Sequence, residues 1–204
     1  MNMGVLAGAA ALAVSGFASA GFVGMEVDSA VISGKTVFTV YAKFNNASDV
    51  VLNAFGLNAI SGAFFQSDFA GGTWGPQLTN PADVATDSFV TIGGTPGFAN
   101  STSADPGWGG PAFIQAGIPA GAGWFNANPP NLQGKVNAVT LRTLLAQFSY
   151  AGVIAAFTTP ITVGFNQGSG TPTAFGTATF TVPAPGAIAL LGLAGLAGRR
   201  RRAA

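Results

Sequence analysis

The chain has 204 residues, of which only 7% are charged, and its formal net charge at pH 7 is +1. It has no cysteine and no histidine, which excludes disulfides, Ser-His-Asp catalysis and metal sites built on thiolate or imidazole ligands. Residues 21–182 hold four basic and seven acidic side chains, so the positive excess belongs to the C-terminal end and gives no electrostatic basis for nucleic-acid binding.

The first twenty residues have the pattern of an export signal. An apolar run over residues 5–14 is followed by small residues that end in Ala18-Ser19-Ala20, an A-x-A site for signal peptidase. No basic side chain precedes this run, and a buried N-terminal helix is the alternative interpretation. The A-x-A site favours a signal peptide over residues 1–20, whose removal leaves Gly21 as the first residue.

A β-rich domain is predicted over residues 21–182. Two runs rich in β-branched and aromatic residues flank Ser33-Gly34, which is typical of a β-hairpin. The face of the second run that we expect in the core is Phe38, Val40, Ala42 and Phe44. A third strand is expected at 50–60, with Gly56 as a bulge, and further strands are expected at 63–66, 88–92, 112–116, 144–150, 161–166 and 173–182.

Residues 137–148 are the one stretch where a helical period competes with a strand. Gln147 and Ser149 alternate with Phe148 and Tyr150, which favours a strand for the second half. Several short strands between Gly, Pro and Asn turns indicate an all-β fold, an antiparallel β-sandwich of jelly-roll or cohesin-like type. Short hydrophobic helices are expected at both ends of the chain.

Residues 71–135 are rich in turn residues and contain all three tryptophans, Trp74, Trp108 and Trp124. Long loops in a compact domain often carry function. Exposed indole rings near asparagine amides would stack on sugar rings, and the carbohydrate-binding surface that this would give is one interpretation. The interpretation that we favour is that the tryptophans pack these loops against the core, because Trp is usually buried. The asparagines in question are Asn100, Asn126, Asn128 and Asn131.

The acidic residues and threonines suggest no catalytic or metal site. Asp83, Asp87 and Asp105 match no Ca²⁺-binding spacing, so we expect them to serve turns and caps. Glu26 is the only glutamate and has no obvious partner for glycoside hydrolysis. A single hydroxyl row on the last strand is typical of a solvent-facing strand rather than of an ice-binding array; it consists of Thr177, Thr179 and Thr181. We therefore predict that the protein is not an enzyme and binds no cofactor or metal.

Residues 182–204 contain three parts in a fixed order. Pro183 and Pro185 lack amide donors and hold their φ angles near −65°, so they end the preceding strand. Residues 186–198 form an uncharged apolar run, which as a helix would rise about 20 Å, less than the ~30 Å of a hydrocarbon core. Four arginines follow, which favour the cytoplasmic side of a membrane: Arg199, Arg200, Arg201 and Arg202.

This tail resembles the PEP-CTERM domain, a bacterial sorting signal also described as an ice-binding protein C-terminal domain. The matching positions are Val182, Pro183, Pro185, the Gly/Ala/Leu run that begins at Gly186, and the four arginines, whereas Ala184 stands where the family usually has Glu. The resemblance implies an exosortase-type processing enzyme as partner, cleavage of the tail at the inner membrane, and delivery to the cell surface or extracellular matrix. A permanent membrane anchor is the alternative interpretation.

The sequence thus predicts three parts: a signal peptide over 1–20, a β-sandwich domain over 21–182, and a sorting signal with a short transmembrane helix over 183–204. The predicted function is that of an exported bacterial protein with a structural or adhesive role at the cell surface or in the extracellular matrix. Its expected partners are signal peptidase, the exosortase-type enzyme and exopolysaccharide. The alternative function is a carbohydrate-binding module that uses the loop tryptophans.

Overall fold

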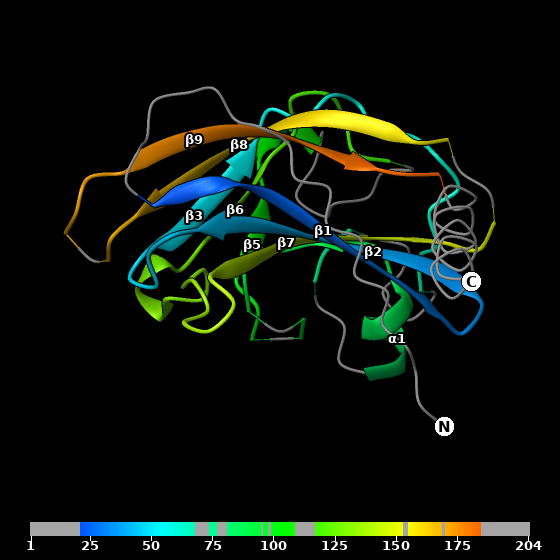
Figure 1. Ribbon diagram of the computed structural model, residues 1–204, viewed down its shortest axis with the longest axis horizontal. Coiled ribbons are helices and arrows are strands. Elements are labelled where there is room, and N and C mark those ends of the chain that lie inside the picture. Colours follow the sequence, from blue (N-terminus) through cyan, green and yellow to red (C-terminus); the bar gives the residue numbers. More distant parts are fainter. Residues whose placement is uncertain are drawn as a thin grey trace, which may run out of the picture.

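The computed structural model describes residues 21–67, 74–76, 81–94, 96–97, 99–108, 117–152, 155–168 and 170–184 (Figure 1). The predicted signal peptide, the strand expected at 112–116 and the tail from Pro185 onward lie outside these residues. The two terminal hydrophobic helices that we expected therefore remain predictions.

The described chain forms two antiparallel β-sheets packed face to face, so the predicted all-β sandwich is confirmed. The first sheet has four strands, in the order β1 (Phe22–Ile32), β2 (Lys35–Phe44), β7 (Arg142–Tyr150) and β4 (Phe89–Val90). The second has five, in the order β5 (Thr102–Ala104), β6 (Trp124–Asn126), β3 (Val50–Phe55), β8 (Phe157–Asn166) and β9 (Ala174–Val182). Helical structure in the described part is limited to α1 (Pro81–Thr86) and the short 3-10 turns η2 (Pro106–Trp108) and η3 (Pro129–Asn131).

The first two strands form the expected hairpin. Ser33 and Gly34 have φ angles of 49° and 76°, the left-handed conformation that a tight two-residue turn requires at both central positions. This turn pairs Ile32 with Lys35 and thereby fixes the register of the whole hairpin. The predicted core face of β2 is confirmed, because its four side chains are at most 1% exposed: Phe38, Val40, Ala42 and Phe44.

The second half of the stretch with two competing periods folds as a strand, as predicted, whereas residues 137–141 form a turn. β7 pairs with β2 from Tyr150 to Arg142 and with β4 on its other side, so tertiary pairing decides against a helix. The third strand is shorter than expected and ends at Phe55, because Gly56 has a φ angle of +81° and turns the chain. The three-residue strands β5 and β6 were not predicted, since they are too short to show an alternating pattern.

Aromatic side chains fill the space between the sheets. Phe148 of β7 lies at the centre, with its ring 6.3 Å from Phe180 of β9 and 5.5 Å from Phe157 of β8. The loop residues Phe64 and Trp74 close over the same ring at 5.8 and 6.0 Å. Both sheets and the loop-rich centre of the chain therefore share one apolar cluster.

Charged residues gather on the outer face of the first sheet. Arg142 on β7 lies 2.8 Å from Asp28 and 3.6 Å from Glu26, both on β1, and its guanidinium covers the ring of Tyr41 on β2. Lys43 also lies 3.6 Å from Glu26. Each exposed pair contributes at most about 1 kcal/mol, but together they link three neighbouring strands from outside.

The central position of Phe148 leads to a test of the packing. Replacing this fully buried ring by alanine leaves a cavity between the sheets, so Phe148→Ala should lower the free energy of unfolding by about 3–5 kcal/mol. Phe175→Ala, at a ring that is 56% exposed, is the matched control and should change it by less than about 1 kcal/mol. Urea unfolding measures both, and equal losses would contradict the assigned core.

Candidate functional site

The three tryptophans do not form a carbohydrate-stacking surface, and that prediction is wrong. Trp74 is 0% exposed, and Trp108 and Trp124 are each 1% exposed. The indole nitrogen of Trp108 donates to the carbonyl of Gly123 at 2.8 Å, and that of Trp124 donates to the carbonyl of Thr91 at 2.9 Å. Burial of these large rings stabilises the loops, so the packing interpretation is the correct one, and the three rings belong to the main apolar cluster between the sheets.

The loop asparagines bond to the protein itself. Asn100 is 8% exposed and donates to the hydroxyl of Thr91, while Asn126 is 3% exposed and donates to the side chain of Asn131. Gln133 is the hub: its amide nitrogen donates to the carbonyl of Ile92 at 2.9 Å, and its amide oxygen accepts from the backbone of Ser101 at 2.8 Å. This amide network, centred on Gln133, ties residues 91–102 to residues 126–133.

An exposed aromatic surface lies elsewhere, on the outer face of the second sheet. Phe55 on β3, Phe125 on β6 and Phe175 on β9 are 37, 39 and 56% exposed. The strand register places them together, since Asn53 lies opposite both Phe125 and Gly164, and Gly164 lies opposite Phe175. The rings of Phe55 and Phe175 are 6.2 Å apart. We call these three side chains the phenylalanine platform.

Gly164 allows the platform to form. A Cβ atom at this position would overlap the side-chain oxygen of Asn53 and lie 3.0 Å from the ring of Phe175. Any larger residue would therefore push Phe175 away from the sheet. The rest of the face continues in threonines, whose hydroxyls bond across the strands in the pairs Thr158–Thr181, at 2.8 Å, and Thr162–Thr177, at 2.9 Å.

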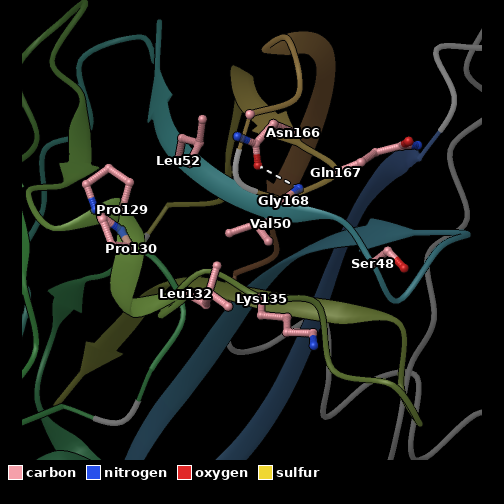
Figure 2. Close-up of a pocket in the computed structure, with 11 residues that line it drawn as sticks. Ser48, Val50, Leu52, Pro129, Pro130, Leu132, Lys135, Asn166, Gln167 and Gly168 are labelled. Carbon is pink, nitrogen blue, oxygen red and sulfur yellow. Dashed lines mark hydrogen bonds between the residues drawn. The ribbon is translucent and has the colours of Figure 1, made fainter.

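A groove lies beside the platform, on the side of the sheet that Asn166 of β8 and Leu52 of β3 share (Figure 2). Its volume is about 610 Å³, and Lys135 is the one charged residue among those that line it. Val50 and Leu132 contribute apolar surface, and the side-chain oxygen of Asn166 accepts from the backbone of Gly168 at 3.2 Å. The remaining lining is Ser48, Pro129, Pro130, Gln167 and Gly170.

The amide network determines the shape of this groove. Residues 129–132 form one wall, and Asn131 donates from its side chain to the hydroxyl of Ser101 at 2.6 Å. Leu132 follows with a φ angle of 54°, which turns its side chain over the groove, and Gln133 anchors the end of the wall. Platform and groove together are the candidate binding face of the protein.

Asp105 serves a turn, as predicted, whereas Asp87 was expected in a turn or cap and instead joins two distant segments. The carboxylate of Asp87 accepts from the backbone of Ser67 at 2.6 Å, and that of Asp105 accepts from the backbone of Gly107 at 2.8 Å. The side chain of Asp83 lies outside the described part. Within that part, no group of three or more acidic side chains is placed to hold a metal ion.

The sequence did not point to the platform, although part of the signal was present. Phe175 alternates with Thr177, Thr179 and Thr181, so the period of β9 places it on their solvent-facing side. Phe55 and Phe125 gave no such signal. Phe55 is the last residue of β3, and β6 is only three residues long, so neither residue lies in the middle of a long alternating run. Their meeting on one face depends on a strand order that pairs distant segments.

The start of the predicted sorting signal coincides with the end of the sandwich. Val182 is 0% exposed and is the last residue of β9, and Pro183 follows directly. Pro185, Gly186 and the four arginines lie outside the described residues, as do Ala18 and Ala20 of the predicted cleavage site. Within the described residues, no helix has the length and apolar character to span a membrane.

Comparison of the chain with models of known protein families, with curated proteins and with solved structures finds no match. The function is therefore inferred from the chain's own residues. Their arrangement offers an aromatic and hydroxyl-bearing contact surface.

The role of Gln133 can be tested by removing its hydrogen bonds at nearly constant volume. Gln133→Met leaves the carbonyl of Ile92 and the backbone N–H of Ser101 without their partner, so the free energy of unfolding should fall by about 2 kcal/mol. Asn128→Ala, at an exposed position whose side chain caps no helix, is the control and should have little effect. Indistinguishable urea midpoints for the two variants would contradict the network's structural role.

Proposed function

We propose that the protein is an exported structural or adhesive protein of the bacterial cell surface or extracellular matrix, sorted through its C-terminal signal. The phenylalanine platform is the observation that carries this proposal, because soluble domains seldom expose several large aromatic rings together without a partner. Aromatic rings and hydroxyl rows suit contact with a surface or matrix. An exosortase-type enzyme and signal peptidase would process the chain during its transient stay at the inner membrane.

The chemistry of the candidate face favours contact over catalysis. General acid–base work needs a side chain that titrates near the working pH. The platform and the threonine rows consist of groups that do not titrate in that range. Glu26 and Asp28 are engaged with Arg142 on the opposite sheet.

The position of the tail fits a tethered adhesive domain. β9 is an edge strand of the second sheet and carries Phe175 near its start, while Val182 at its end precedes the predicted sorting signal. A chain held through residues after 182 would leave the outer face of the second sheet free to meet a partner.

The second candidate function is binding of exopolysaccharide. The groove and the neighbouring phenylalanine rings would form the site, and the tryptophans would take no part in it. The groove is of a size that accommodates small ligands, and it adds the amides of Asn166 and Gln167 to the neighbouring rings. Sugar rings present both C–H faces and hydroxyls, which match rings and amides in one site.

Sorting can be tested on the native protein by mass spectrometry. Processing at both ends should give a mature chain that begins at Gly21 and lacks Arg199, Arg200, Arg201 and Arg202. Ala184→Glu restores the residue usual in the PEP-CTERM signature and should not reduce tail removal. Mature surface material that still ends at Ala204 would refute processing of the tail.

The contact surface can be tested with a triple substitution of the platform. Phe55→Ser, Phe125→Ser and Phe175→Ser together should weaken retention on cells or purified exopolysaccharide roughly tenfold or more, since each aromatic contact contributes about 0.5–1.5 kcal/mol. The control replaces Val23, Val31 and Val139, which are 50, 75 and 91% exposed, by serine. Retention that falls equally in both triple variants, or in neither, would contradict the assignment.

A further inference from the structure

Asp49 is a buried carboxylate that lacks a hydrogen-bond donor among the described residues. The residue lies between β2 and β3 and is 0% exposed, although it is close to the molecular surface. Its backbone is satisfied, since its carbonyl accepts from Val136 at 2.9 Å and its N–H donates to Asn46 at 3.3 Å. Within the described part of the chain, neither side-chain oxygen accepts a hydrogen bond. Burial raises the pKa of the Asp49 carboxyl, and the neighbouring Gln167 side chain lowers it only in part.

The basic side chains of the domain are not the missing partner. Arg142 and Lys43 form ion pairs with acids of β1, and Lys35 lies over the ring of Phe65. Lys135 lines the groove, and no ion pair joins any of these four described side chains to Asp49. A buried carboxylate without a partner lowers the free energy of unfolding, and proteins seldom keep one without a compensating cation or hydrogen-bond donor.

Gly21 lies directly against this carboxylate. A Cβ atom on Gly21 would overlap Oδ2 of Asp49, and the φ angle of +120° also favours glycine. The backbone nitrogen of Gly21 is attached to that same Cα atom at about 1.46 Å. Position 21 therefore brings its nitrogen close to the Asp49 carboxylate.

The position of Gly21 is fixed by a hydrogen bond to its carbonyl and by the packing of the next residue. Its carbonyl accepts from the backbone of Asn45 at 2.8 Å. The next residue, Phe22, packs its ring 5.7 Å from Phe44 and 6.4 Å from Phe165, and it covers Gly176 of β9. The first residue of the domain is therefore held at the junction of the two sheets.

We propose that removal of residues 1–20 creates the partner of Asp49, because the new α-ammonium of Gly21 forms an ion pair with its carboxylate. This inference rests on the proposed export and on cleavage at the A-x-A site. Signal peptidase, a hydrolase, would add water across the Ala20–Gly21 peptide bond. The C–N bond breaks, the carbonyl carbon of Ala20 gains oxygen as a carboxylate, and the nitrogen of Gly21 becomes an amine that is protonated at neutral pH.

The chemical change converts one amide N–H into a cation with three donors. An α-amino group ordinarily has a pKa of about 7.7–8.0, and a neighbouring carboxylate raises that pKa because it stabilises the charged form. The same attraction lowers the pKa of the carboxyl. The sandwich would thus reach full stability only after its leader is removed.

The test compares chains that differ only at the N-terminus and at position 49. One chain runs from Gly21 to Ala204, and the other keeps Ser19-Ala20, which moves the ammonium two residues away. Keeping the two residues should lower the thermal unfolding midpoint by about 5 °C in the Asp49 background. In the Asp49→Asn background the same extension should change the midpoint by less than about 1 °C. Equal shifts in the two backgrounds would overturn the proposal.

A direct titration gives the second readout and does not depend on a change in stability. NMR of the chain that begins at Gly21 should give an α-amino pKa clearly above the ordinary range, and Asp49→Asn should return it to about 7.7–8.0. An ordinary value with Asp49 present would also overturn the proposal. Both experiments use chains with defined ends, so failure of signal cleavage in cells would count against the proposed export and not against the ion pair.

Discussion

The packing of the two sheets around Phe148 is the contact on which the rest of the structure depends. The chain has no cysteine and its described residues form few ion pairs, so the burial of apolar surface must supply most of the stability of the sandwich. Phe157 and Phe180 meet this ring from the second sheet, and Trp74 meets it from the loop-rich segment. The tryptophans are thus part of the core, and the large exposed rings of the second sheet are the phenylalanines on its outward-facing side.

Hydrogen bonds between uncharged side chains hold the loop-rich segment of this protein in place, where many other proteins use charged groups. The described residues between β4 and β7 form only short strands and 3-10 turns, and their backbone groups need partners where they pack against the sheets. Gln133, Asn100 and Thr102 supply them through amides and hydroxyls whose geometry does not depend on pH. The groove wall at 129–132 is therefore held by the same bonds that satisfy the interior.

The fold was predictable where a local pattern and the tertiary structure agree. Alternation of Phe38, Val40, Ala42 and Phe44 identified β2 and its buried face, and Ser33-Gly34 identified the hairpin turn. The candidate site was not predictable in the same way. Phe55, Phe125 and Phe175 lie on three strands brought together by long-range pairing, and the burial of Trp124 depends on a bond to Thr91, 33 positions earlier.

Charge is scarce in this domain, which makes the location of each charge informative. The two acids on β1 share Arg142 and Lys43 in a solvent-facing group, where water can replace any partner that is lost. Asp49 has no such substitute, because its carboxylate is shielded from solvent and lies directly against Gly21. Under the proposed cleavage after Ala20, this carboxylate beside the new N-terminus would link removal of residues 1–20 to the stability of the sandwich.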